Sequence, residues 1–429
     1  MSKKTRITVS EAKKKQCEVN VGVVGHVDHG KTTLVQSISG EWTDRYSEEI
    51  KRGISIKLGY ATAVIVKCSK CPPPQCYMTT TMSGGTTCPH CGSEVQFLRK
   101  ISFVDAPGHE ILMATVISGA SLMDGAMLVI AANEECPQPQ TREHLAALQI
   151  TGVEKVIIIQ NKIELITEKE GINHYKQIKS FVKGTIAENA PIIPTSAIFK
   201  SNIDLVVQAI EEIIPTPKRD TAKPLQMFTA RSFDVNKPGT TPEKLAGGVI
   251  GGAIVQGKVK VGERIEIKPG IRIESEGVTT YQPLVTKVIS LKAGNASLKE
   301  AYPGGLIGIG TKMDPSITKA DGLVGNVAGA KGTLPPVFNK LVFKVHLMER
   351  VVGSKDLLKV KDIKTQENLM INVGAAATRG QVTSLKGDTI HVELRRPVCA
   401  EIEQRMAISR LVKGRWRLIG WGELKDQSS

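Results

Sequence analysis

The sequence has no long uninterrupted run of apolar residues. Asp124 and nearby glycines break its best candidate stretch, so nothing approaches the ~18 residues that a membrane-spanning helix requires. The first residues, Met1 to Arg6, also lack the apolar stretch of a secretory signal peptide. We therefore expect a protein that is neither inserted in a membrane nor exported, and that works in the cytoplasm.

Acidic residues are in the minority. The chain of 429 residues has 42 aspartates and glutamates against 57 lysines and arginines, a net charge of +15. The excess is concentrated in residues 1–15, with six basic residues and one acidic residue, and in residues 331–429, with 18 and 10. Such clustering favours a phosphate-rich partner. The alternative is that the charge only keeps the surface solvated.

The strongest motif is GHVDHGKT at residues 25–32, which matches G-x-x-x-x-G-K-[ST]. An apolar run precedes it and a predicted helix follows, which is the strand–loop–helix context of a phosphate-binding loop. The two glycines let backbone amides turn toward phosphates, the lysine places a charge beside them, and the threonine hydroxyl can bind Mg²⁺. The nucleotide contacts that we expect here are Asp28, His29, Gly30, Lys31, Thr32 and Thr33.

A second motif lies in residues 101–108, ISFVDAPG, an apolar strand that ends in D-x-x-G. In phosphate-loop NTPases an acidic residue on a neighbouring strand holds Mg²⁺, and Asp105 fits that role. The backbone amide of Gly108 could contact the terminal phosphate. D-A-P-G alone indicates only a turn, but together with the phosphate loop it favours a nucleotide site.

Two later segments resemble the base-binding elements of GTP-binding proteins. A buried-strand run at 156–160 is followed by Asn161-Lys162-Ile163-Glu164, and Pro191 to Pro194 lead to a Ser-Ala pair. A carboxylate at position 164 can accept from both N–H donors of guanine, although the family pattern has aspartate there. A solvated glutamate is the alternative. The expected contacts are Asn161, Lys162, Glu164, Ser196, Ala197 and Ile198.

Four of the eight cysteines form two C-x-x-C pairs, Cys68 with Cys71 and Cys88 with Cys91. Each pair can aim two thiolates at one tetrahedral metal, so the spacing predicts a zinc knuckle at 68–91. The alternative is a redox or disulfide role, which a cytosolic location disfavours. Cys76 and His90 are spare ligands nearby. The proline- and glycine-rich segment between the pairs has no apparent core of its own, so we expect a loop held by the metal.

The chain organisation predicts three domains. Strand-like and helix-like runs alternate over the first ~215 residues, which predicts a mainly parallel sheet with helices on both faces. A proline-rich linker at 214–220 follows, and then short Val/Ile runs separated by turn residues, which are typical of β-barrels. A second Pro/Gly cluster lies at 331–336. We therefore expect an α/β nucleotide-binding domain at 1–215 and β-barrels at 216–330 and 331–429.

These features together resemble the translational GTPases of the elongation factor Tu superfamily. Within it, the chain is most similar to the gamma-subunit family of archaeal initiation factor 2, over essentially its whole length. Four stretches carry that resemblance: KLGY at 57–60 with the cysteine insert after it, ECPQPQT at 135–141, RSFDVNKPG at 231–239 and GRWRLIGWG at 414–422.

The resemblance implies further residue roles. Ser55 stands where switch 1 carries a Mg²⁺-binding threonine, beside Thr32 and Asp105 as the other ligands, while Asp28 and the Gly53 carbonyl could hold a second Mg²⁺. His109 would position the attacking water, with Val27 and Ile54 as an apolar gate. A surface residue at a helix start is the alternative for His109. GTP hydrolysis would be slow until a partner completes the site.

The resemblance also implies function and partners. The GTP form would carry methionylated initiator tRNA to the small ribosomal subunit, and hydrolysis to GDP would release it. Alpha and beta subunits would dock on the first barrel and the nucleotide-binding domain, respectively. The candidates for tRNA contact are Tyr60, Arg231, Arg395, Arg396, Arg415 and Arg417.

Two other functions compete with this hypothesis. A selenocysteine-type elongation factor would share the fold and the reaction but carry a different tRNA. A zinc-stabilised RNA-binding scaffold would use the nucleotide only structurally, which the intact set Lys31, Thr32, Asp105 and His109 argues against.

Overall fold

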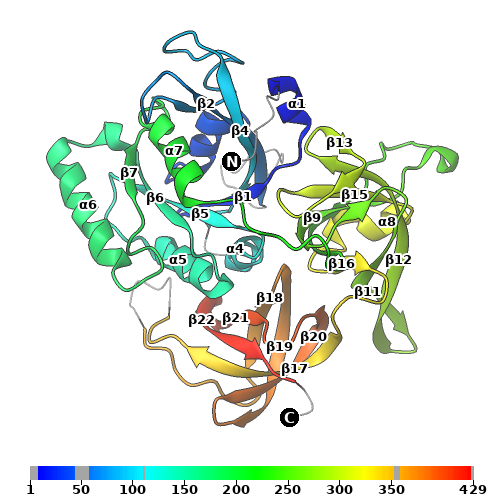
Figure 1. Cartoon of the computed structure of the whole chain (residues 1–429). Helices are drawn as coiled ribbons and strands as arrows, with labels where there is room; N and C mark the ends of the chain where they lie inside the picture. Colours follow the sequence, from blue (N-terminus) through cyan, green and yellow to red (C-terminus); the bar gives the residue numbers. More distant parts are fainter. Residues whose placement is uncertain (1–7, 44–57, 110–111, 352–357, 427–429) are drawn as a thin grey trace. The chain divides into compact units, whose positions relative to one another are not determined.

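The computed structural model describes residues 8–43, 58–109, 112–351 and 358–426, which form two compact units (Figure 1). The division falls between Pro217 and Lys218, within the predicted linker. Among the described residues, no helix combines the length and the apolar character that crossing a membrane requires.

The first unit contains a seven-stranded sheet in the order β3-β2-β4-β1-β5-β6-β7. The five strands from β4 to β7 in that order are parallel, and β2 and β3 are antiparallel to their neighbours. The strand β6 is buried along its whole length, as the continuous run of isoleucines requires when helices cover both faces. The strands are β1 (Val19–Gly25), β2 (Gly59–Cys68), β3 (Tyr77–Thr79), β4 (Val95–Asp105), β5 (Gly125–Ala131), β6 (Val156–Asn161) and β7 (Ile192–Thr195).

Helices lie on both faces of this sheet, as predicted (Figure 1). Apolar side chains of α2 and α7 pack against one face of β1, β5 and β6, while α4 and α5 contact one another on the other face. Local signals set the ends: a Thr167–Glu170 capping box starts α6, and left-handed Gly40 and Gly152 end α2 and α5. The helices are α1 (Val9–Lys14), α2 (Lys31–Ser39), α4 (Met113–Ala120), α5 (Pro139–Thr151), η2 (Ile163–Leu165), α6 (Glu168–Val182) and α7 (Ile203–Ile213).

The segment between the two cysteine pairs differs from the prediction. It contains β3, which extends the sheet through pairing with β2. Tyr77 and Met78 belong to the main apolar core of the first unit, together with Cys68, Cys76 and Cys88. The segment has no separate core, as expected, but it is not only a loop: it adds a strand and buries apolar residues in the core of the unit. Residues 76–78 are too few to be recognised as a strand among prolines and glycines.

The second unit begins with a barrel. Its main ring runs β11-β16-β8-β9-β15-β12 and closes through the pairing of β12 with β11. Its interior is an apolar cluster that includes Met227, Ile254 and Leu291. The elements are β8 (Gln226–Phe233), η3 (Pro242–Lys244), β9 (Val249–Gln256), β10 (Val259–Lys260), β11 (Arg264–Ser275), β12 (Val278–Ala293), β13 (Ala296–Leu298), β14 (Glu300–Ala301), β15 (Ile307–Thr311), α8 (Pro315–Thr318), η4 (Lys319–Asp321) and β16 (Val327–Ala330).

A second closed barrel follows, in the order β17-β20-β19-β18-β21-β22. Phe343, Leu369 and Ile408 are among the fully buried residues of its core. The predicted fold class, an α/β nucleotide-binding domain followed by two β-barrels, is confirmed. The strands are β17 (Val337–Leu347), β18 (Asn368–Val373), β19 (Ala376–Lys386), β20 (Thr389–Cys399), β21 (Arg405–Val412) and β22 (Arg415–Leu424).

Candidate functional site

The GHVDHGKT motif includes the last residue of β1, the loop that follows and the first two residues of α2. Its two fixed glycines, Gly25 and Gly30, have positive φ values of 144° and 85°. A Cβ atom on Gly25 would lie 2.2 Å from the Val129 carbonyl oxygen, and one on Gly30 would lie 2.4 Å from Asn161 Nδ2. Neither position therefore accommodates a side chain. Within the described part of the chain no side chain caps the start of α2, and such a helix start is a common anion site.

The D-x-x-G motif lies directly against this loop. β1 and β4 are parallel neighbours, and the Thr32 hydroxyl donates to Asp105 Oδ2 at 2.8 Å. A Cβ atom on Gly108 would lie 2.6 Å from Lys31 Nζ and 2.8 Å from the Val27 amide nitrogen. The structure thus brings a carboxylate, a hydroxyl and an ammonium group into one small region, and these groups suit Mg²⁺ and phosphate.

Two of the predicted base-binding residues, Asn161 and Ala197, contact one another, and Asn161 also contacts the phosphate loop. Asn161 Nδ2 donates to the His29 carbonyl oxygen at 2.9 Å, and Asn161 Oδ1 accepts from the Ala197 amide at 3.1 Å. Asn161 therefore joins the loop to the Ser-Ala segment. Glu164 lies in the short helix η2, and its Oε2 atom is buried with no hydrogen-bond partner among the described residues. A buried acceptor without a donor fits the N–H edge of guanine.

Two buried histidines make hydrogen bonds that hold the phosphate loop in place: His29, within the loop, and His144, outside it. His144, on α5, accepts a hydrogen bond from the Gly25 amide at its Nδ1 atom, 2.7 Å away. His29 is fully buried, and its Nδ1 lies 3.1 Å from the Val129 carbonyl oxygen, to which it donates. Burial lowers the pKa of each imidazole to about 3. Both rings are therefore neutral at neutral pH, and the 3.5 Å contact of His29 with Glu134 is not an ion pair.

Two contributors to this region were not predicted from sequence. His144 lies in the run QTREHL, which has the pattern of an ordinary helix. Thr43 lies beyond the end of α2, and its hydroxyl donates to Asp105 Oδ2 at 2.6 Å. Neither residue belongs to a motif known to contact the phosphate loop or the magnesium ligand. The contacts join residues that are 119 and 62 positions apart, so the sequence did not indicate them.

The remaining predicted nucleotide residues have varied surroundings. Asp28 is exposed, with a left-handed φ of 60°, whereas Val27, Thr33 and His109 are half-buried. Ile198 is 66% exposed beside the Ser-Ala pair. The residues predicted for switch 1, which are Gly53, Ile54 and Ser55, lie outside the described residues.

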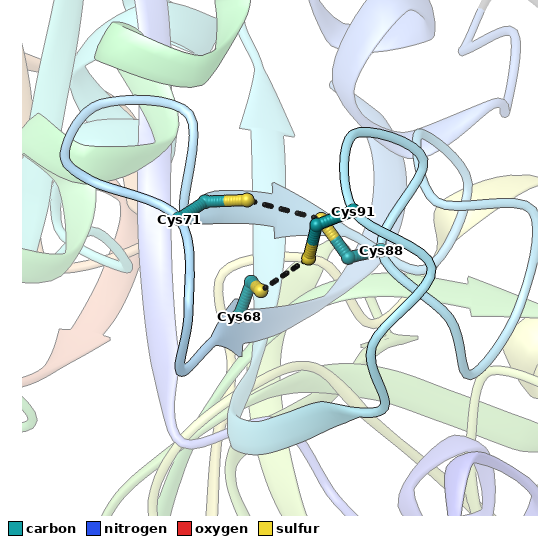
Figure 2. A group of neighbouring side chains, drawn as sticks. All are labelled: Cys68, Cys71, Cys88 and Cys91. Carbon is teal, nitrogen blue, oxygen red and sulfur yellow. Dashed lines mark hydrogen bonds between the residues drawn. The ribbon is translucent and has the colours of Figure 1, made fainter.

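The four predicted zinc ligands come together beside β3. Figure 2 shows their sulfur atoms facing one another, with Sγ–Sγ distances of 3.5 Å for Cys68–Cys91 and 3.6 Å for Cys71–Cys88. All four sulfurs lie within 4.8 Å of one another. Ligands 2.3 Å from a tetrahedral zinc are separated by about 3.8 Å, so the cluster has the size that zinc requires. Hydrogen bonds with Ser93 lower the pKa of Cys91, whereas the hydrogen bond to Cys91 raises the pKa of Cys71. In the absence of metal the thiolate is therefore favoured at Cys91.

The predicted tRNA contacts differ in accessibility. Arg395 and Arg415 are exposed, whereas Arg396 and Tyr60 are partly buried. Arg231 pairs with Asp321 at 2.9 Å. Arg417 is only 7% exposed. Of the predicted contacts, Arg395 and Arg415 are therefore the better placed to meet a nucleic-acid backbone.

Family models match most of the chain. The GTP-binding domain of elongation factor Tu matches residues 16–216, domain 2 of that factor matches residues 247–326, and the C-terminal domain of initiation factor eIF2 gamma matches residues 339–424. These matches fall on the α/β unit and on the first and second barrels, in that order.

Among solved structures, a bacterial selenocysteine-specific elongation factor has a TM-score of 0.70 at 22% identity, covering 96% of this chain and 58% of that chain. The elongation factor SelB from Methanococcus maripaludis, in complex with a GTP analogue, has a TM-score of 0.68 at 23% identity, covering 95% of this chain and 79% of that chain. Similarities at this level of identity concern the fold alone.

The curated relatives are much closer in sequence. Translation initiation factor 2 subunit gamma from Pyrococcus furiosus is 58% identical over 414 residues, covering 96% of this chain and 99% of the relative. The protein of that name from Methanocaldococcus jannaschii is 57% identical over 411 residues, covering 96% and 98%. With the motifs and the fold in agreement, the chain belongs to the gamma-subunit family of archaeal translation initiation factor 2, and it is a GTP-binding and GTP-hydrolysing subunit of that factor.

Proposed function

We propose that the chain, with GTP bound, carries methionylated initiator tRNA to the small ribosomal subunit and releases it after hydrolysis. The main support for a nucleotide-dependent switch is the contact of the D-x-x-G motif with the phosphate loop, through the hydrogen bond of Thr32 with Asp105. Membership of the initiation factor family supports the tRNA cargo. The selenocysteine-type alternative has only a shared fold behind it.

We assign four residues to the binding of the phosphates and of the magnesium ion. Lys31 places its charge beside the outer phosphates, and the Gly108 amide contacts the terminal one. Thr32 and Asp105 would hold Mg²⁺, which when bound would offset the phosphate charge. Because Gly108 packs against the Val27 amide and Lys31, a change at the terminal phosphate reaches the D-x-x-G segment directly.

Hydrolysis depends on positioning a water molecule. His109 follows Gly108 immediately, and we assign it the orientation of that water, with Val27 and Ile54 screening it from solvent. Ser55 supplies a further Mg²⁺ ligand, and Asp28 with the Gly53 carbonyl a second cation site. Gly53, Ile54 and Ser55 lie outside the described residues, so this part rests on family resemblance.

Guanine selectivity is assigned to Glu164. Its buried Oε2 accepts from the guanine N–H groups, and adenine has no matching donor pair. Asn161, which binds both the phosphate loop and Ala197, keeps the base site in register with the phosphates.

Zinc is assigned to Cys68, Cys71, Cys88 and Cys91. When bound, it links the two C-x-x-C turns on either side of β3. Its role is structural, since all four positions of a tetrahedral ion are occupied by protein sulfur.

The alpha and beta subunits are assigned to apolar surfaces. The first barrel has a hollow lined by Val235, Leu245 and Ile289, and the first unit has one lined by Ile166, Ile172 and Tyr175. Exposed apolar side chains of this kind favour protein contacts. They support docking of the alpha subunit on the first barrel and of the beta subunit on the nucleotide-binding domain.

The deciding experiment compares methionylated initiator tRNA with elongator methionyl-tRNA, for the chain alone and with alpha and beta added. Each complex is measured with GTP and with GDP. We expect preference for the initiator in the GTP state. The matched control is Lys31→Ala, which should lower nucleotide affinity by about a hundredfold or more and remove the difference between the two nucleotides. Equal, nucleotide-independent binding of both tRNAs would contradict the proposal.

A further inference from the structure

Two hydroxyl groups from different segments meet on one oxygen of Asp105. Thr32 donates to Asp105 Oδ2 from the first turn of α2, and Thr43 donates to the same atom from beyond the end of that helix. Asp105 is 1% exposed and Thr43 is 4% exposed. In this desolvated setting a hydrogen bond is stronger and its loss is more costly than at the surface.

The turn that carries Thr43 is itself well anchored. The chain leaves α2 at Gly40, in the left-handed region with a φ of 77°. The Ser39 hydroxyl then accepts from the Glu41 amide at 3.0 Å. The last carbonyl groups of the helix, those of Ile38 and Ser39, accept from the hydroxyls of Thr79 and Thr81 at 2.7 and 2.9 Å.

Gly59, at the start of β2, lies close to both Thr43 and Asp105. Gly59 pairs with Asp105 in the sheet register. A Cβ atom on Gly59 would lie 2.7 Å from Thr43 Cβ and 3.4 Å from Asp105 Cβ. The missing side chain at position 59 therefore leaves the space that Thr43 occupies beside the carboxylate.

We propose that Thr43 is a positioning residue of the magnesium site and acts through Asp105. By donating to the same Oδ2 atom as Thr32, it fixes the orientation of the carboxylate relative to the Thr32 hydroxyl. Groups that hydrogen-bond metal ligands orient them in this way, and their loss typically lowers metal affinity by about 10- to 100-fold. This inference rests on the assignment of Asp105 to Mg²⁺ in the proposed function.

The test is the rate of GDP release as a function of free Mg²⁺, using a fluorescent GDP. Thr43→Val keeps the branched shape and removes the hydroxyl, whereas Thr43→Ser keeps the hydroxyl. We expect Thr43→Val to require about tenfold more Mg²⁺ for half-maximal retention of GDP, and Thr43→Ser to remain near the wild-type requirement. In excess EDTA, all three proteins should release GDP at the same rate, because the hydroxyl acts through the metal site.

Two further variants separate the possible failures. Gly59→Ala, which forces Thr43 away from Asp105, should reproduce the Mg²⁺ shift of Thr43→Val. Asp105→Asn should raise the Mg²⁺ requirement at least as much. A wild-type requirement in Asp105→Asn would overturn the Asp105 assignment, whatever Thr43 does.

If Asp105→Asn shifts the requirement and Thr43→Val does not, the positioning role of Thr43 is wrong while the Mg²⁺ site stands. The role is equally wrong if Thr43→Val accelerates GDP release by the same factor with Mg²⁺ and in EDTA, since the hydroxyl would then serve the fold. Thermal unfolding of Thr43→Val and Thr43→Ser checks that the two compared proteins are equally folded.

Discussion

At the scale of the residue, His144 connects folding to the phosphate loop. Its Nδ1 accepts from the Gly25 amide, so the ring must be neutral, with its proton on Nε2. The pKa of about 3 lies far below the value of about 6.5 in an unfolded chain. The unfolded state therefore binds an extra proton between these two values. The stabilising contribution is complete above pH 6.5 and falls as the pH is lowered toward 3.

This linkage predicts a pH effect at one residue. Between pH 6.5 and 5, protonation of His144 in the unfolded state should cost the first unit about 2 kcal/mol of its free energy of unfolding. His144→Asn keeps an acceptor near the Gly25 amide and does not titrate. We expect the variant to lose about 2 kcal/mol less stability than the wild type over this pH range. Hydrogen exchange of the β1 amides, corrected for the intrinsic exchange rates, measures this difference. Equal losses in both proteins would contradict the assignment.

A second prediction at this scale concerns His109, which directly follows the glycine that packs on the phosphate loop. His109→Ala should slow GTP hydrolysis by about a hundredfold while GTP affinity stays within a factor of about two, because the ring is assigned to the water and not to the nucleotide. Single-turnover hydrolysis and GTP titration on the same preparation measure the two effects. A parallel fall in both quantities would show that His109 serves binding.

At the scale of the element, α2 links the phosphate loop to the cysteine module, which is the insertion at residues 68–91. Its first turn carries Thr32, and its last carbonyl groups accept hydrogen bonds from Thr79 and Thr81, on and just beyond β3. Helix ends leave carbonyl groups unsatisfied, and the hydroxyl groups of the insertion supply hydrogen bonds to two of these carbonyl groups. The cysteine module is thus part of the nucleotide-binding unit and not an appended loop.

The zinc prediction follows from this arrangement. In Cys71→Ser with Cys91→Ser, the changes avoid the two most buried ligands, so the apolar core is retained. We expect the loss of about one zinc per chain and faster hydrogen exchange in residues 69–75, 81–94 and the last turn of α2. Cys136→Ser, which changes a half-buried cysteine outside the cluster, is the control and should keep its zinc. Metal analysis that still finds one zinc in the double variant would refute the ligand set.

At the scale of the whole molecule, charge is the property that acts at long range. The net charge is +15, and residues 331–429 supply a large part of the excess. Each phosphate contact made by a basic residue releases counterions, so affinity for RNA falls as salt concentration rises. The exposed arginines of the second barrel are the residues through which we expect this effect.

We expect Arg395→Ala with Arg415→Ala to reduce the slope of log affinity for initiator tRNA against log salt by about 1.5. Lys169→Ala with Lys176→Ala, two exposed charges on α6, is the control and should leave the slope unchanged. Binding titrations at several salt concentrations measure it. An unchanged slope in the arginine variant would place the RNA contact elsewhere on the chain.

The phosphate loop, the D-x-x-G motif, the cysteine pairs, the order of the α/β domain and the barrels, and the family could all be predicted from the sequence. These are carried by contiguous residues, because a tight turn, a strand or a metal-binding turn requires particular residue types at fixed local spacing. The helix predicted after the phosphate loop is present as α2, because its start after Gly30 and its end at Gly40 are local signals.

The distant residues that support this site could be identified only from the folded chain. Thr43 reaches Asp105 across 62 residues, and His144 reaches Gly25 across 119. Neither residue type nor spacing indicates such contacts, because they result from the order in which parallel strands and helices assemble. The same reason explains β3: a three-residue strand has almost no local signal, and its place at the sheet edge depends on pairing with β2 and on burial against α2 and α7.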